Sequence, residues 1–195
     1  MKKSSIKYIF AILLFGVLGC KKENPTTVNP PLEFVPIYAP CYTGTGEASA
    51  HKQTSNWSAG ASCISYWASG KKYWMVQLTT CTTDGSFREI LAIGGFPDEL
   101  QKGYFKIIPS GTTHPEGTAA ANYGTYQQDG DVVEDIYYQD TTVTNNFAII
   151  DRWDEINKIV EGRFFLSFQI KEPVQNSINP KKVGFSSGQF WATIP

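Results

Sequence analysis

Apolar and polar residues alternate with a period of two along much of the chain after residue 40. The clearest case is Gly162–Lys171, where Phe164, Leu166, Phe168 and Ile170 occupy alternate positions. Polar side chains fill the intervening positions except for one phenylalanine at residue 165. Because successive side chains of a strand point to opposite faces, this pattern predicts a strand with one face in a core.

Shorter segments of the same kind, separated by turn residues, predict further strands. They are Glu47–Lys52, Ala61–Trp67, Lys72–Thr80, Phe87–Ile93, Tyr104–Ile108, Asp131–Gln139, Thr144–Asp151 and Gly188–Ile194. Only Asp151–Ile159 has a helical pattern, and it is too short to predict a helix. Strands do not alternate with helices, so the sequence predicts an all-β fold. We expect an antiparallel β-sandwich or flattened barrel of about nine or ten strands.

The N-terminus has the pattern of a secretory signal. Three lysines lie within the first seven residues, and the apolar segment Ile9–Leu18 follows them. Ten apolar residues are too few to span a bilayer as a helix. The ending Val17–Cys20 resembles a bacterial lipobox, in which the cysteine is lipidated and becomes the first mature residue. We therefore predict a lipoprotein signal peptide at 1–19 and lipidation of Cys20.

The next residues predict a linker between the lipid and a folded domain. Lys21–Pro31 is polar and proline-rich and has no hydrophobic face to bury. The predicted organisation is a lipidated cysteine and flexible linker at 20–31, followed by one domain at 32–195. The start of the mature chain, Cys20–Asn24, resembles lipoproteins of Bacteroidota outer membranes. This resemblance implies a protein anchored to the outer membrane by its lipid, on either the periplasmic face or the cell surface.

Composition agrees with a packed domain and excludes two classes of partner. Charged residues make up 18% and aromatic residues 14% of 195 residues, which excludes a disordered chain. The formal net charge is −1. Cleavage before Cys20 removes three of 17 basic residues and none of the 18 acidic ones, so the mature charge is −4. This balance excludes nucleic acid and anionic lipid surfaces as electrostatic partners.

Three cysteines remain for the domain if Cys20 is acylated. They are Cys41, Cys63 and Cys81. An oxidising compartment predicts one disulfide among them, with the pairing open and one thiol left over. No CxxC spacing occurs and the chain has two histidines, so a metal site is not predicted.

No motif predicts an enzyme or a cofactor. The sequence lacks GxSxG, HExxH, a P-loop and a Rossmann fingerprint. His51 lies in a predicted strand and His114 in a loop, with no elbow motif to support a catalytic triad. We therefore predict structural histidines, no catalytic residues, no metal and no cofactor.

Two acidic clusters have alternative interpretations. Asp129, Asp131, Glu134 and Asp135 offer oxygen ligands for calcium, but Asp-Gly is also a favoured hairpin turn and the strand alternation separates the side chains. The second cluster surrounds a tryptophan. It consists of Asp151, Asp154 and Glu155 around Trp153. These residue types suit a glycosidase, yet they equally suit a solvated turn, and the latter is our prediction.

Aromatic residues are abundant in this chain and are the best candidates for contacts with a ligand or partner. In a strand, one of two adjacent aromatics fills the core while the other faces outward. Trp67 and Trp74 flank a predicted turn at Ser69-Gly70 and could lie close together across that hairpin. Exposed, they would stack on sugar rings or anchor a protein partner. The alternative is that both simply pack in the core.

Short motifs over residues 44–194 resemble a family of uncharacterised Bacteroidota outer-membrane lipoproteins with a β-sandwich-like domain. The matching segments are Gly46–Ala48, Asn56–Ala59, Gly103–Phe105, Asn122–Tyr126, Val160–Phe164 and Ser187–Trp191. The resemblance implies a fold and a location, and it supplies no catalytic residue.

Together these observations predict a lipid-anchored, non-catalytic protein. The first expectation is an accessory or protein-interaction subunit of an outer-membrane complex, with an outer-membrane protein as its partner. The alternative is a surface glycan-binding module that uses exposed Trp and Tyr side chains.

Overall fold

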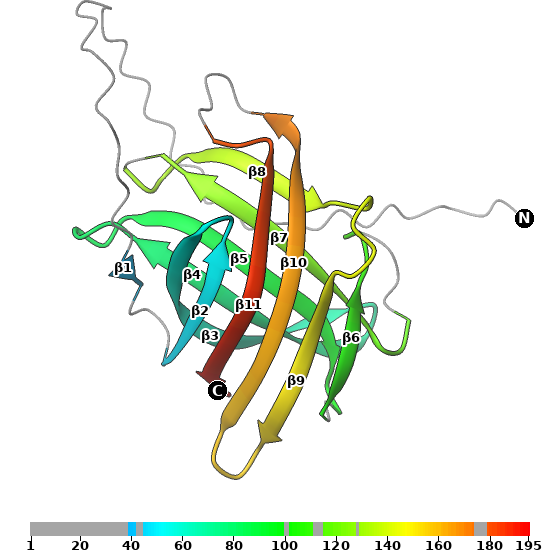
Figure 1. The fold of residues 1–195 in the computed structure, drawn as a ribbon. Coiled ribbons are helices and arrows are strands. Elements are labelled where there is room, and N and C mark those ends of the chain that lie inside the picture. The colour runs from blue at the N-terminus through cyan, green and yellow to red at the C-terminus, as the bar shows by residue number, and fades with distance from the viewer. Residues whose placement is uncertain (1–38, 42–44, 100–101, 111–114, 128, 174–178) are drawn as a thin grey trace, which may run out of the picture. The chain divides into compact units, whose positions relative to one another are not determined.

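Eleven strands form one hydrogen-bonded sheet in the computed structural model (Figure 1). The structure describes residues 39–41, 45–99, 102–110, 115–127, 129–173 and 179–195. The strands are β1 (Ala39–Pro40), β2 (Gly46–Lys52), β3 (Ser55–Ala68), β4 (Lys71–Cys81), β5 (Phe87–Pro97), β6 (Gly103–Ile107), β7 (Thr118–Tyr126), β8 (Val133–Gln139), β9 (Phe147–Asp154), β10 (Ile159–Pro173) and β11 (Lys182–Thr193). This arrangement confirms the predicted all-β fold.

Eight of these strands close into a ring. Each of β2, β3, β4, β5, β7, β8, β10 and β11 pairs antiparallel with the next, and β11 pairs with β2. Closure leaves no long unpaired edge among these strands, which removes the template for edge-to-edge aggregation. The result is a flattened barrel, one of the two architectures that the sequence predicted.

β6 and β9 complete the wall where β8 is too short to cover it. The C-terminal half of β10 pairs with β8, beginning at Phe168 opposite Gln139. Its N-terminal half pairs with β9, with Phe164 opposite Ala148. β6 lies between β9 and the start of β7, where it makes the one parallel pairing of the described sheet. The segment that looked helical, 151–159, is the end of β9, a turn and the first residue of β10.

The ring has two ends that are used below. Connections β2–β3, β4–β5, β7–β8 and β10–β11 lie at one end, which we call the Glu89 end because that residue lies inside it. Connections β3–β4, β5–β6 and β9–β10 lie at the other, which we call the hairpin end. This assignment follows from the antiparallel order of the ring.

Small side chains and large aromatic rings fill the interior together. β2 and β3 contribute the buried alanines Ala48, Ala50, Ala59 and Ala61. The largest fully buried rings are Tyr123, Tyr137, Phe96, Phe164, Phe168 and Phe185. Pairing small with large residues fills the interior at native packing density without spreading the walls apart.

β1 lies where β3 and β4 separate, beyond their last pair at Gly60 and Thr79. It pairs with the last two residues of β4, through Ala39 opposite Cys81 and Pro40 opposite Thr80. The backbone of Cys41 presses against Gly60 of β3 so closely that a Cβ on Gly60 would collide with the Cys41 carbonyl oxygen. This contact explains a glycine in the middle of a strand.

The predicted signal peptide at 1–19, the linker at 20–31 and Cys20 lie outside the described residues, as does His114. A compact unit covers Tyr38–Pro195. Among the described residues, no helix has the length and apolar character needed to cross a membrane.

Candidate functional site

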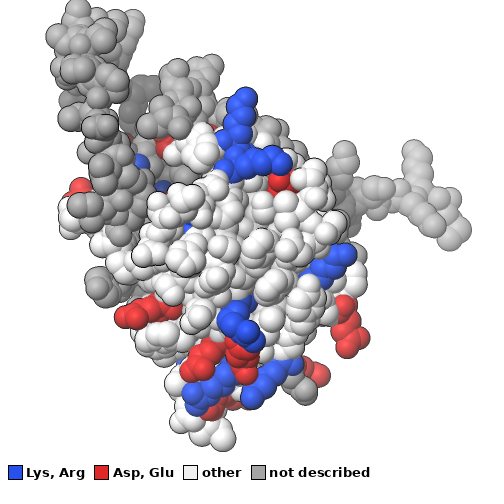
Figure 2. All heavy atoms as spheres, viewed as in Figure 1, with Lys and Arg blue, Asp and Glu red and all other residues white. Residues whose placement is uncertain are grey.

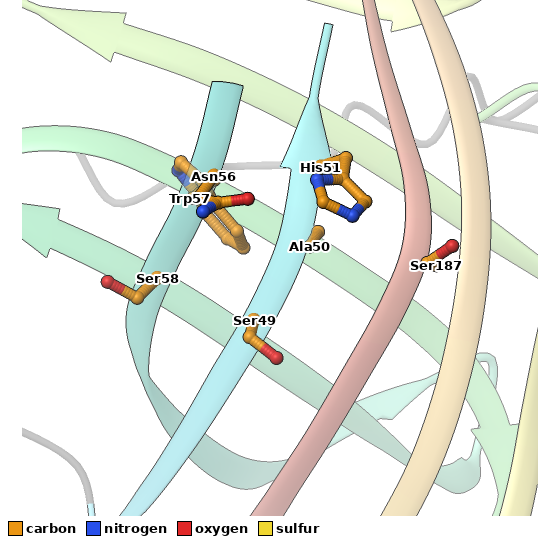
Figure 3. Close-up of a pocket in the computed structure, with 7 residues that line it drawn as sticks. All are labelled: Ser49, Ala50, His51, Asn56, Trp57, Ser58 and Ser187. Carbon is orange, nitrogen blue, oxygen red and sulfur yellow. The ribbon is translucent and has the colours of Figure 1, made fainter. Parts of the chain in front are cut away.

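A shallow hollow of about 320 Å³ opens on the outer wall over the β2–β3 hairpin (Figure 3). Its exposed lining consists of Ser49, His51, Asn56, Ser58 and Ser187, which we call the polar hollow. The buried residues Ala50 and Trp57 complete the lining. The polar hollow therefore offers hydroxyl, amide and imidazole groups and no carboxylate or ammonium group.

The β2–β3 turn that carries the polar hollow is tied to β11. His51 and Asn56 are cross-strand partners on either side of this turn. Gln53, in the turn, has a left-handed φ of 55°. Its backbone N–H donates to the Gly184 carbonyl at 2.9 Å, and its Nε2 donates to the Lys182 carbonyl at 2.7 Å. These two bonds fix the turn against its neighbour.

Ser187 enters the polar hollow through an irregularity of β11. The register of β11 against β2 shifts between Ser186 and Gln189, and Ser187 has a φ of 52°. A non-glycine residue in this left-handed region is strained, and such strain clusters at functional sites. Bulges of this kind re-aim a side chain, and here the side chain borders the polar hollow (Figure 3).

A row of aromatic rings begins where the polar hollow ends. Phe165 on β10 stacks on Phe147 of β9, with ring centroids 6.2 Å apart and an interplanar angle of 19°. Phe147 in turn contacts Tyr104 of β6 at 5.6 Å. All three are partly or largely exposed, and Tyr104 is 56% exposed. We call these three residues the aromatic row.

The register places the aromatic row and the polar hollow side by side. Phe165 lies between two residues of β10 that pair with Gly188 and Phe185, so it faces the Ser186–Ser187 bulge. Ser186 pairs with His51. The polar hollow and the aromatic row thus form one continuous surface, which we call the binding strip. It crosses six adjacent strands, β6, β9, β10, β11, β2 and β3, and spans about 24 Å at the usual strand spacing.

The centre of this wall carries no charge. Figure 2 shows that Lys, Arg, Asp and Glu side chains gather toward the ends of the face formed by β2, β11, β10 and β9, whereas its middle is uncharged. The ion pair next to the binding strip joins Arg163 and Asp151, with Nη2 and Oδ1 2.7 Å apart. These two charges neutralise each other.

A buried carboxylate lies inside the barrel behind the polar hollow. Glu89 is 1% exposed and accepts from Trp57 Nε1 at 2.6 Å, Tyr123 Oη at 2.6 Å and Thr80 Oγ1 at 3.2 Å. Lys52 forms an ion pair with its other side and lies over the Tyr123 ring. Four donors satisfy this carboxylate, so it is a structural anchor with no free lone pair for substrate.

The charge of Glu89 survives its burial. Burial raises the pKa of this carboxyl, but the Lys52 charge and the hydrogen bonds from Lys52, Tyr123 and Trp57 outweigh burial and hold the pKa below its ordinary value. Lys52 and Trp57 flank the β2–β3 turn. Glu89 thus fixes both sides of the hairpin whose outward residues line the polar hollow.

The acidic cluster before and within β8 does not converge on one point. Asp129 accepts from the backbone N–H of Asp131, which makes a turn with Gly130 at a φ of 76°. Glu134 and Asp135 instead accept from Asn179 Nδ2, at 2.7 and 2.9 Å. Within the described ranges, no three His, Cys, Asp or Glu side chains are arranged to hold a metal ion.

The acids around Trp153 stabilise the β9–β10 hairpin. Asp154 accepts from Asn157 and Arg152, and these hydrogen bonds lower its pKa. Asp151 pairs with Arg163, which likewise lowers the pKa of Asp151. Glu155 accepts from Trp153 Nε1 at 3.3 Å. Each carboxylate is held by a neighbour, as in a solvated turn.

The prediction that Trp67 and Trp74 are exposed together as ligand-binding aromatics is wrong for Trp74. Trp74 is 7% exposed and packs edge-on against Trp153 at 5.3 Å, because its position on β4 points into the ring. Trp67 is 73% exposed. Trp67 pairs with Lys72 and Trp74 with Ser65, so the two indoles are offset along the hairpin and do not form a shared platform.

The structure resolves the cysteine alternatives. Cys41 and Cys81 form a disulfide with their Cα atoms 5.0 Å apart, and it ties β1 to the end of β4. Cys63 is a free, buried thiol in the interior. Burial raises the pKa of Cys63 to about 12, so this thiol is unreactive at neutral pH.

Sequence reasoning missed the binding strip, although one signal pointed to it. Phe165 is the apolar exception on the polar face of its strand, and its neighbour Phe164 is buried. Its partners Phe147 and Tyr104 are far away in sequence, and only the ring topology brings them together.

Comparisons with protein-family models, curated proteins and solved structures find no match to this chain.

Proposed function

We propose that this protein is a lipid-anchored, non-catalytic module that binds a neutral glycan along the binding strip. The observation that carries the proposal is the continuity of the polar hollow with the aromatic row across six strands. This is the glycan-binding alternative that the sequence predicted. The proposed site consists of the polar hollow and the aromatic row, and it does not include Trp67 or Trp74.

The chemistry of the strip matches the chemistry of sugars. A sugar ring presents hydroxyl groups at its edge and apolar C–H groups on its faces. Hydroxyl, amide and imidazole groups pair with the former, and aromatic side chains contact the latter. The uncharged middle of this wall in Figure 2 favours a neutral glycan over one with carboxylate or phosphate groups. The length of the strip favours an oligosaccharide over a monosaccharide.

The strip is better suited to binding than to hydrolysis. Glycoside hydrolysis uses two carboxyl groups on either side of the scissile bond. The polar hollow and the aromatic row contain no carboxylate, and Asp151 beside them is occupied by Arg163. The proposed function is therefore recognition.

A second candidate function, docking to an outer-membrane protein partner as an accessory subunit, is favoured by another part of the wall. On β3 and β4, Ile64 lies opposite Met75, whose side chain covers Gly94. Tyr66 stacks on Tyr73 beside them, at 5.8 Å. Partly exposed apolar residues without charges between them are typical of a protein-interaction surface.

The test is binding of neutral and uronic-acid polysaccharides to the full lipidated protein in detergent, measured by calorimetry. We expect neutral chains alone to bind. Phe165→Ala and His51→Ala should each weaken binding at least tenfold, because each removes one half of the strip. Ile64→Ser, further along β3 and opposite Met75 of β4, is the matched control and should leave affinity unchanged.

Two outcomes would contradict the proposal. Unchanged affinity in Phe165→Ala and His51→Ala would place any glycan elsewhere. No glycan binding, combined with recovery of a barrel protein from native membranes that is lost in Ile64→Ser, would favour the accessory-subunit function and the resemblance to the outer-membrane lipoproteins.

A further inference from the structure

The two most exposed large apolar side chains among the described residues lie at the same end of the barrel. Ile156 is 93% and Trp67 is 73% exposed. Trp67 lies near the end of β3, just before the β3–β4 turn, and Ile156 lies in the β9–β10 turn. Both turns belong to the hairpin end, away from Lys52 and Glu89.

The side chains of Trp67 and Ile156 are not required to fill the core at the hairpin end. The interior at the hairpin end is already closed by Trp74 against Trp153 and by Phe96 against Phe105, which contact edge-on at 5.3 and 5.0 Å. Trp67 lies beyond this closure. At 73% exposure, most of the Trp67 indole is in contact with water, which a second surface at this end would remove.

Polar contacts hold the turns beside both residues. Around Ile156, Asp154 accepts from the backbone N–H and Nδ2 of Asn157, at 2.8 and 2.7 Å, and from Arg152 at 2.8 Å. Beside Trp67, its cross-strand partner Lys72 forms an ion pair at 2.9 Å with an aspartate of the β5–β6 connection. Little conformational entropy is lost when such turns meet a partner.

The charges of the hairpin end nearly cancel. The basic residues of its turns and strand ends are Lys71, Lys72, Lys102, Arg152 and Lys158, and the acidic ones are Glu47, Asp98, Glu99, Asp154, Glu155 and Glu161. A surface with five basic and six acidic residues does not suit an anionic lipid surface. It suits zwitterionic headgroups, among which Trp is a preferred residue and Lys can extend its ammonium to the phosphates.

The predicted anchor leaves this end within reach of a bilayer. β1 joins β4 at Thr80 and Cys81, which is the Glu89 end. The 11 residues of β4 span about 36 Å, whereas the 19 residues from Cys20 to Tyr38 can span at most about 65 Å. The chain is therefore long enough for the hairpin end to lie on the membrane that holds the lipid.

We infer that the hairpin end is a contact surface for a zwitterionic phospholipid bilayer, with Trp67 and Ile156 at headgroup depth. The carboxylate of Glu155, next to Ile156, keeps the contact shallow. This inference rests on the lipid anchor of the proposed function and leaves the binding strip exposed on the side of the barrel.

The test uses the full lipidated protein in phosphatidylcholine vesicles with brominated acyl chains, which quench tryptophan on contact. The chain has five tryptophans, and two of them are exposed near the hairpin end, Trp67 at 73% and Trp191 at 42%. We expect Trp67→Phe to lose more than half of the quenching of the wild type. Trp191→Phe, which removes the less exposed tryptophan on the side of β11, should lose less of the quenching than Trp67→Phe.

A second readout follows the other turn. Ile156→Cys carrying an environment-sensitive dye should brighten at least twofold on vesicles, and Ile64→Cys carrying the same dye should not. Cys63 is buried and Cys41 is bonded to Cys81, so labelling is selective.

Vesicle flotation separates the possible failures. A protein that does not float lacks the anchor, which would overturn the anchored form of both proposals. A protein that floats with Trp67 unquenched and no dye response would overturn the inference alone. If Trp67 were then shielded in native membranes, the hairpin end would belong to a protein partner.

Discussion

The ring of Phe190 on β11 lies where a side chain on Gly162 of β10 would have to be. The two residues are cross-strand partners, and a Cβ on Gly162 would lie 2.6 Å from Cζ of Phe190. Two residues further along, the relationship is reversed, because the ring of Phe164 covers Gly188. The two rings stack at 6.4 Å. These reciprocal pairs explain the two Gly-x-Phe motifs of the sequence.

Gly162→Ala should destabilise the protein by about 2 kcal/mol, because the added methyl displaces the Phe190 ring and overpacks the core. It would also collide with the carbonyl of Ile149. The measurement is a urea titration, in which the midpoint should fall at unchanged slope. Gly184→Ala on β11, where no atom lies within 4 Å of the added methyl, is the matched control and should not destabilise. Equal effects of both changes would refute the packing account.

Glu89→Gln should lower the free energy of unfolding by about 2–4 kcal/mol at neutral pH, because it leaves the charge of Lys52 without its buried partner. Arg163→Gln, which breaks an exposed pair with Asp151, should cost much less, because water screens that pair. Urea titrations of both variants test this ranking. A loss as small as that of Arg163→Gln would show that the buried pair contributes little.

The same carboxylate predicts a pH dependence. The folded pKa of Glu89 is below its ordinary value of 4.5, so the stability it contributes is present above that value and is lost as the pH falls through the lower, folded pKa. The difference in unfolding free energy between wild type and Glu89→Gln should therefore shrink between pH 7 and pH 3. A difference that stays constant over this range would mean that the pKa of Glu89 is the same in the folded and the unfolded protein, and one that grows would mean that Glu89 is protonated in the native state.

The fold class could be predicted from alternation alone, and the strand positions largely agree. Gly162–Lys171 was predicted as a strand and lies within β10. Ring closure could not be predicted, because it depends on the pairing of β2 with β11 from opposite ends of the domain. The local pattern fixes which face of each strand is buried and says nothing about which strands meet.

The candidate site was harder to predict for the same reason. Trp67 and Trp74 were chosen by their distance from a turn, and the register then placed one in water and the other in the core. His51 was given a structural role, and its place in the polar hollow arises from a bulge at Ser187 that no sequence signal marked.

Loss of the disulfide should destabilise the protein by about 3–4 kcal/mol, since Cys41 and Cys81 close a loop with a sequence separation of 40 residues. The double change Cys41→Ser and Cys81→Ser tests this in urea. Thiol titration of the denatured, unreduced protein should find one reactive thiol among the three domain cysteines, at Cys63. Three reactive thiols would show that the bond does not form in the cell.

Cys20→Ala should release the protein from the membrane fraction, because the remaining contact at the hairpin end is shallow and a lipid chain supplies most of the binding free energy. Cell fractionation measures this directly. Cys63→Ala is the matched control, since it removes a buried thiol that anchors nothing, and it should stay with the membrane. If Cys20→Ala also stays, a protein partner holds the domain there. Adding Ile64→Ser and Trp67→Ala to Cys20→Ala separately would then show which surface that partner uses.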